Sequence, residues 1–255
     1  MDSKKRLLNA YYSTIDRSRF KVETRGFVPE LLDAEATHGA FTYGEFKNGI
    51  FKYCFSGAAP ALFDWCLESH LRAELNICCY LNPQENSIFA FNLDSYEKLD
   101  AVDNTPEIRS FAEIVSDILV KLCLRPMIIR SGHGYHFWCR LAEPVANSKL
   151  QSFMDAVVAV ATFELIARRI EIGKLQCICY PRVNTRDVSI RLFGSRHTVT
   201  GRFSGIVKNA GENETILDEE QSWQFFEQCL NQPHITREQF AHALDCVCEI
   251  ASHIK

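Results

Sequence analysis

A short polar turn between two apolar runs constrains the fold of this 255-residue chain more than any other feature. The turn is Ser131-Gly132-His133-Gly134, and the runs Met127–Arg130 and Tyr135–Arg140 lie on either side of it. Glycine adopts backbone conformations that other residues avoid, so two glycines in four residues favour a tight reversal. The pattern therefore predicts two short strands joined by this turn.

Strand and helix patterns alternate around this hairpin. Apolar residues at helical or alternate spacing predict most of the elements, and Asn-Gly favours a hairpin turn at Lys47-Asn48-Gly49. The expected elements are a partly helical lead over residues 1–35, a hairpin Phe41–Phe55, a helix Pro60–Leu75, a strand Ser87–Asp94, helices Pro106–Leu124 and Ser148–Ile170, a strand Val188–Phe193, and two helices around Pro233. The expected fold class is α+β, with central antiparallel or mixed sheets flanked by helices.

We expect one compact domain with three parts. Residues 1–80 form an α/β lead, residues 81–210 carry the motifs described below, and residues 211–255 form an acidic helical segment. With 47% hydrophobic residues the chain has enough apolar material for a sizeable core.

The composition indicates an intracellular protein. No apolar run reaches the roughly 18 residues that span a bilayer, and Met1–Arg6 is polar with no apolar region behind it, unlike a secretory signal. The 11 cysteines are odd in number and scattered, as reduced thiols are. We expect a cytoplasmic, nucleoid or nuclear location and no membrane partner.

Positive charge is concentrated in one segment. Residues 168–208 hold nine Lys or Arg against two acids, a net charge of +7, although the whole chain carries −4. A basic segment on an acidic protein is typical of an anion site, although a solvated basic face explains it equally well.

Three groups of polar residues could carry chemistry. In the first, Asn92 and Asp94 lie two apart at the end of a strand and so share a face. Their oxygens could hold Mg²⁺ or Mn²⁺, and the alternative is a strand that ends in turn-forming residues.

The second group is Ser131-Gly132-His133-Gly134-Tyr135-His136. Backbone N–H groups in a glycine turn can bind phosphate. His136 and Trp138 share a face of the strand that follows the turn. The alternative to a ligand-binding role is that His136 is a core residue with its hydrogen bonds satisfied.

The third group lies around Gly194. Arg191 is expected on the strand face opposite a buried row, and Arg196 and His197 follow a Gly-Ser turn. Guanidinium groups around such a turn suit a triphosphate.

In this order the three groups resemble the catalytic core of archaeo-eukaryotic primases, which include small primase subunits and primase-polymerases. The resemblance covers roughly residues 87–207 and implies a sheet-centred nucleotidyltransferase core. It implies synthesis of DNA or RNA on a single-stranded DNA template from nucleoside triphosphates, with two Mg²⁺ or Mn²⁺ ions, and a helicase or other replication protein as partner. In this resemblance Asp94 and Asn92 would be the metal ligands, and together with His136 they would be the catalytic residues. The nucleotide would be bound by Ser131, His136, Arg191, Arg196 and His197.

The sequence departs from the family pattern at two carboxylate positions. Asn92 stands where the first motif has its first acid, and Tyr180 stands where the third motif has an aspartate. Asp187 or Glu171 could supply a missing ligand.

Three functions follow as alternatives: a primase or primase-polymerase, a catalytically degenerate module of the same fold that binds nucleotide or single-stranded nucleic acid, and a strand-nicking initiator with a tyrosine nucleophile. A zinc site is not expected, because Cys177-x-Cys179, Cys246-x-Cys248 and Cys78-Cys79 lack the spacing of a structural zinc knuckle.

Overall fold

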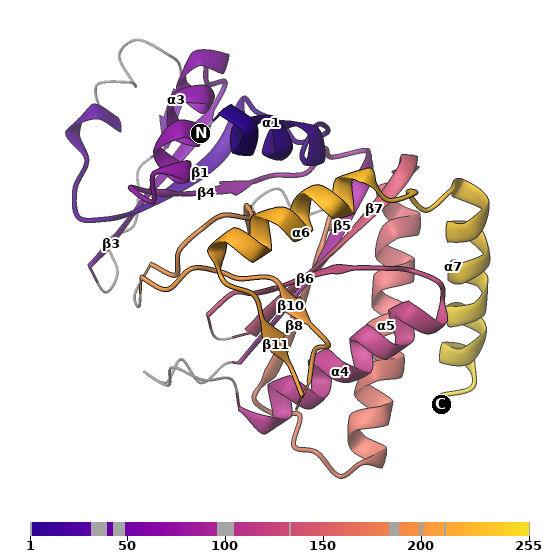
Figure 1. Ribbon diagram of the computed structural model, residues 1–255. Helices are drawn as coiled ribbons and strands as arrows, with labels where there is room; N and C mark the ends of the chain where they lie inside the picture. The colour runs from indigo at the N-terminus through magenta and orange to yellow at the C-terminus, as the bar shows by residue number, and fades with distance from the viewer. Residues whose placement is uncertain are drawn as a thin grey trace. The chain divides into compact units, whose positions relative to one another are not determined.

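The computed structural model describes residues 2–31, 40–42, 49–95, 105–132, 134–183, 189–198, 201–211 and 213–254. The chain forms two compact units, Met1–Asn82 with Asp187–Ser204, and Pro83–Arg186 with Gly205–Lys255. Segment 187–204 thus returns to the first unit after most of the second has been completed. The fold class is α+β, as predicted, with antiparallel sheets flanked by helices (Figure 1).

In its described residues, the first unit has a five-stranded antiparallel sheet and the helices α1 and α3. Its strand order is β2-β3-β1-β4-β9. The elements are α1 (Asp2–Tyr11), β1 (Arg19–Arg25), β2 (Ala40–Thr42), β3 (Ile50–Ser56), α3 (Pro60–Leu71), β4 (Asn76–Cys79) and β9 (Ile190–Arg191).

Two strands of this sheet bear on the predictions. The expected hairpin is confirmed in its pairing, with Phe41 opposite Phe55, while its Lys47-Asn48 turn lies outside the described residues. The strand expected over 188–193 is described only as Ile190–Arg191, and Val188 lies outside the described residues. It ends there because the chain turns at Gly194, whose φ is +89°.

The second unit has a four-stranded antiparallel sheet in the order β6-β7-β5-β8 and a two-stranded ribbon. Its elements are β5 (Glu85–Ser95), α4 (Pro106–Lys121), β6 (Met127–Arg130), β7 (Gly134–Ala146), α5 (Asn147–Ala167), β8 (Leu175–Tyr180), β10 (Val207–Lys208), β11 (Thr215–Ile216), α6 (Glu219–Asn231) and α7 (Arg237–Ser252).

Helices α4, α6 and α7 of this unit begin at polar caps, whereas α5 has Ala146 at its N-cap and no side-chain cap. Thr105 accepts a hydrogen bond from the Ile108 N–H ahead of Pro106 in α4, and Asp218 and Thr236 form capping boxes at α6 and α7. Side chains that accept from the first N–H groups replace partners that a helix start lacks. These caps fix where α4, α6 and α7 start.

Helices α4, α5 and α7 form one layer on the four-stranded sheet (Figure 1). The aromatic rings of Phe89 on β5, Phe153 on α5 and Phe240 on α7 lie within 5.3–6.0 Å of one another, centroid to centroid. Rings at this spacing bury large apolar area and hold the layer to the sheet.

Helix α5 is long and apolar enough to span a membrane by length and composition, with 21 residues and a mean hydropathy of 1.5 over its most apolar 18-residue stretch. Its sequence includes Asp155 and Glu164. Its buried apolar side chains belong to the core between the sheet and α7, while Phe163 and Ile166 are exposed. The core helix of a globular domain can have the same length and composition.

Candidate functional site

One face of the four-stranded sheet carries the polar residues of the first two motifs. On β5 the odd-numbered Phe89, Phe91 and Leu93 pack into the core below α4 and α5. Side chains alternate along a strand, so Asn92 and Asp94 project from the other face, as predicted. We call it the motif face; by pairing it also carries His136, Gln176, Ile178 and Tyr180.

Strand pairing places His136 next to Asn92. Asn92 is directly opposite His136 on β7 and opposite Ile178 on β8. Directly paired residues have Cβ atoms about 5 Å apart, and diagonal neighbours about 7 Å. The sheet therefore brings Asn92, Asp94 and His136 together, although they come from two separate motifs.

The glycine turn is a tight hairpin. Arg130 pairs with Tyr135, and the Ser131 N–H donates to the Gly134 carbonyl at 3.0 Å. Gly132 has φ +101°, and a Cβ on Gly134 would lie 1.8 Å from the Leu93 carbonyl oxygen of β5. The predicted turn is confirmed; its Ser131 N–H is used to close it, and His133 lies outside the described residues.

A distant carboxylate holds both ends of this hairpin. The Tyr135 hydroxyl donates to Glu214 Oε2 at 2.5 Å, and Arg130 Nη1 lies 3.2 Å from Glu214 Oε1. The Glu214 side chain is only 8% exposed and that of Arg130 15%. Sequence reasoning missed Glu214 because it lies in an acidic segment with no motif, 79 residues from Tyr135.

Asp94 is the one carboxylate that the described residues place on the motif face near His136. The residues opposite it and opposite Asn92 on β8 are Gln176 and Ile178. Tyr180 shares this face, opposite Ala90, and is buried. Glu171 is exposed ahead of β8, and Asp187 lies outside the described residues.

The described part of the chain holds no group of three His, Cys, Asp or Glu residues that could bind a metal ion. One carboxylate and one amide do not provide the ligands that a two-metal site needs. A single Mg²⁺ or Mn²⁺ held by Asp94 and Asn92 stays a prediction.

The residues of the third motif lie in the first unit. Arg191 Nη2 lies 2.8 Å from Glu23 Oε2, and Lys52 Nζ lies 3.5 Å from Glu23 Oε1. Burial alone would raise the pKa of Glu23, but these two cations lower it below its usual value. The guanidinium expected to bind a triphosphate thus has an acidic partner within its own unit.

The Gly-Ser turn after Arg191 is anchored by Asn76 of β4. The Asn76 amide accepts from the Arg196 N–H at 3.0 Å and donates to the Arg196 carbonyl at 2.6 Å. The Arg196 guanidinium lies 5.9 Å from the ring centroid of Phe203, and His197 is buried. Arg196 and His197 therefore sit on a fixed backbone.

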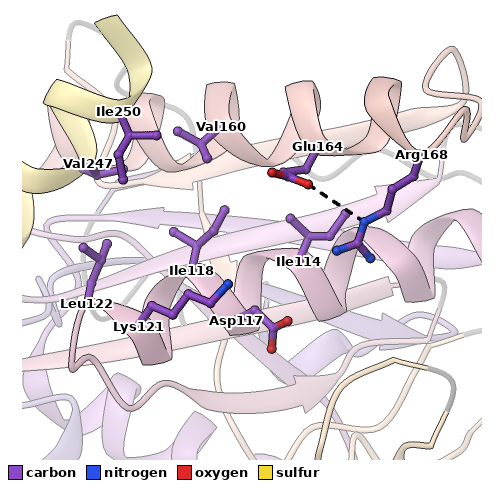
Figure 2. A pocket seen from close by; sticks show the side chains of 10 residues that line it. All are labelled: Ile114, Asp117, Ile118, Lys121, Leu122, Val160, Glu164, Arg168, Val247 and Ile250. Atoms are coloured by element: carbon purple, nitrogen blue, oxygen red, sulfur yellow. Dashed lines mark ion pairs between the residues drawn. The ribbon is translucent and has the colours of Figure 1, made fainter. Parts of the chain in front are cut away.

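The structure thus groups the predicted residues by unit. Asn92, Asp94, Ser131 and His136 lie together in the second unit, and Arg191, Arg196 and His197 lie in the first. A separate cavity of about 250 Å³ lies between α4, α5 and α7 (Figure 2). Its floor is apolar and its rim holds Asp117, Lys121, Glu164 and Arg168, so it includes none of the predicted site residues.

Comparison of the sequence with protein-family models and with curated proteins finds no match. Among solved structures, the polymerase domain of Ligase D from Mycobacterium tuberculosis, in complex with DNA, is similar to this chain, with a TM-score of 0.41 and 13% sequence identity. The alignment covers 98% of this chain and 89% of that one. The similarity concerns the chain trace and does not identify an activity.

Proposed function

We propose that this chain is a primase-polymerase-type module that binds nucleoside triphosphates and single-stranded nucleic acid on its motif face. The observation that carries the proposal is the pairing of Asn92 with His136 beside the glycine hairpin. In this proposal His136 donates to a phosphate oxygen of the nucleotide, and the Ser131 hydroxyl adds a second donor. A helicase or other replication protein would bring the module to its template.

The absence of further carboxylates from the described motif face favours binding over catalysis. Two positions that the resemblance would fill with acids are Asn92 and Tyr180, and the β8 residues beside Asn92 and Asp94 are Ile178 and Gln176. An amide and a phenol are neutral near pH 7, so neither adds the negative charge that attracts a divalent ion.

The test is the affinity of a fluorescent ATP or dATP analogue for the parent chain and for His136→Ala. Loss of a hydrogen bond to a charged phosphate costs about 1.5–3 kcal/mol, so the variant should bind about 10–100 times more weakly. His242→Ala removes an exposed histidine from α7 and serves as the matched control. Equal affinities for His136→Ala and the parent would contradict the proposal.

Nucleotidyl transfer is the second candidate function, and it is favoured by Asp94, a carboxylate diagonal to His136 on the motif face. The assay is nucleotide incorporation on primed and unprimed single-stranded templates, with Mg²⁺ and then Mn²⁺. Product that disappears in Asp94→Ala but not in the exposed-residue control Asp245→Ala would establish it. No product from the parent chain under either metal would leave binding as the function.

A further inference from the structure

The cavity between α4, α5 and α7 has no role in the proposed function. Its volume is about 250 Å³, and all the residues that line it belong to the second unit. Its apolar lining comes from all three helices and consists of Ile114, Ile118, Leu122, Val160, Val247 and Ile250. A cavity of about 150 Å³ with an aliphatic and aromatic lining is large enough to bind benzene. This cavity can therefore hold a phenyl ring together with the carbon atoms that join the ring to a polar group.

The cavity is apolar at one end and charged at the other. Val247 and Ile250 of α7 lie at one end, while Glu164 and Arg168 of α5 lie at the opposite end (Figure 2). Ile250 is 50% exposed, so the apolar end is in contact with water. Covering apolar surface of this kind favours binding. The shape and polarity together fit a small ligand with one apolar part and one charged part.

Two of the four charged residues on the rim pair with each other. Glu164 Oε2 lies 4.0 Å from Arg168 Nε, one turn later on α5. Asp117 and Lys121 have the same spacing on α4, where an acid and a base commonly pair. These two form no ion pair with each other or with any other residue in the described part of the chain. The rim therefore offers one negative and one positive side chain to a ligand.

The spacing of Asp117 and Lys121 suits a ligand that carries both charges close together. Cβ atoms four residues apart on a helix are about 5–6 Å apart. An α-amino acid has its ammonium and carboxylate groups on the same carbon atom, so one group can face Asp117 while the other faces Lys121. A ligand with a single charge would leave one of these two side chains without a partner.

We propose that this cavity binds a free α-amino acid with a large apolar side chain, such as phenylalanine. Lys121 binds the carboxylate, Asp117 binds the ammonium group, and the apolar lining encloses the side chain. The proposal does not depend on the proposed function, because the cavity includes no residue of the motif face. Exposed ion pairs contribute little to affinity, so we expect a Kd in the millimolar range.

The test is isothermal titration calorimetry of the full chain with L-phenylalanine. Lys121→Gln and Asp117→Asn each remove one charge contact and should weaken binding about threefold. The matched controls Lys149→Gln on α5 and Asp245→Asn on α7 remove exposed charges outside the cavity and should bind as the parent does. Absence of binding by the parent up to about 20 mM phenylalanine, or equal affinities for the parent and both rim variants, would overturn the proposal.

Ligands that lack one charge test each contact separately. Phenylpropionate keeps the ring and the carboxylate but has no ammonium group, so Asp117→Asn should not weaken its binding. Phenethylamine keeps the ring and the ammonium group but has no carboxylate, so Lys121→Gln should not weaken its binding. Benzyl alcohol has no charge and should bind more weakly than phenylalanine. If benzyl alcohol binds as tightly as phenylalanine, the site takes apolar compounds in general and the proposal is wrong.

A variant that fills the cavity tests the place of binding. Val160→Phe adds a ring at a buried lining residue and should abolish phenylalanine binding. Val120→Phe adds the same ring to α4 at a side chain that is 58% exposed and outside the lining, so it should bind as the parent does. If circular dichroism shows that Val160→Phe is unfolded, Ile250→Asp replaces it, because a charge at the apolar end should also prevent binding. Parent-like affinity in the folded variant would overturn the proposal.

Discussion

His70 is buried in the first unit with both ring nitrogens in hydrogen-bond contact. Nε2 lies 3.0 Å from the Phe193 carbonyl, and Nδ1 accepts from the Ile77 N–H at 3.3 Å. This pattern requires a neutral ring with its proton on Nε2. Burial lowers the pKa of His70 to about 4, although the contact with the Phe193 carbonyl acts in the opposite direction.

The low pKa of His70 makes stability depend on pH. The unfolded state binds a proton near pH 6.5 and the folded state only near pH 4, so the free energy of unfolding should fall as pH drops through this interval. The expected loss is about 3 kcal/mol in full. Urea unfolding of the parent chain at several pH values between these limits measures it.

The same series on His70→Gln separates this histidine from the others. The variant should be less stable at pH 7, where the parent keeps its contacts, and its stability should change less between pH 6.5 and 4. His242→Ala, exposed on α7, should follow the parent. Parallel pH curves for His70→Gln and the parent would show that His70 does not cause the dependence.

At the scale of elements, the hairpin between β6 and β7 depends on glycine at position 134. A Cβ there would lie 1.8 Å from the Leu93 carbonyl oxygen, which belongs to the backbone of the neighbouring strand and cannot move aside alone. Gly134→Ala should therefore lower the free energy of unfolding by about 3 kcal/mol. Gly173→Ala is the control, because a Cβ at Gly173 meets nothing within 4 Å. Similar unfolding midpoints for the two variants in urea would disprove the steric argument.

The carboxylate of Glu214 should act as a positioning group for the same hairpin. Glu214→Gln keeps the shape but removes the charge that pairs with Arg130, and Tyr135→Phe removes the 2.5 Å bond. We expect each to cost about 1–3 kcal/mol and the two effects to be less than additive, since both act on one network. A double-mutant cycle in urea measures the coupling, and strict additivity would show that the two contacts act independently.

Elements with a clear period could be predicted from the sequence. Pro106 and the helical spacing of the apolar residues after it predicted α4. The glycine turn predicted β6 and β7, and β6 has the bounds that were predicted. Strand β1 was not predicted, because its alternate residues Arg19, Lys21 and Glu23 are charged and the segment was interpreted as part of a partly helical lead. Half of its residues face away from the core, and the sheet that buries the others comes from distant sequence.

The candidate site was predictable only within single strands. The two-residue spacing placed Asn92 and Asp94 on one face, which the structure confirms. The pairing of Asn92 with His136 required the register between β5 and β7, and register depends on long-range packing. Glu214 could not be found for the same reason, since its partners lie far away in sequence.

For the whole molecule, the division into units makes a prediction about fragments. Segment 189–198 supplies β9 and the buried Phe193. The Phe193 carbonyl accepts a hydrogen bond from His70, and the Phe193 N–H donates to the Tyr12 hydroxyl at 3.1 Å. A fragment of residues 1–82 lacks these contacts and should show no cooperative thermal unfolding. The same fragment joined through a flexible linker to residues 187–204 should regain it, and a cooperative transition in the short fragment would contradict this.

The late position of β9 also bears on the order in which the protein can fold during synthesis. The ribosome releases β5, β6, β7 and β8 with α4 and α5 before residue 187, whereas the sheet that begins at β1 must wait for β9. Nascent chains usually fold from the N-terminal end. In this chain, the five-stranded sheet of the first unit should be completed after the four-stranded sheet of the second unit. Strands β1, β3 and β4 should therefore remain accessible to chaperones and to other nascent chains for longer.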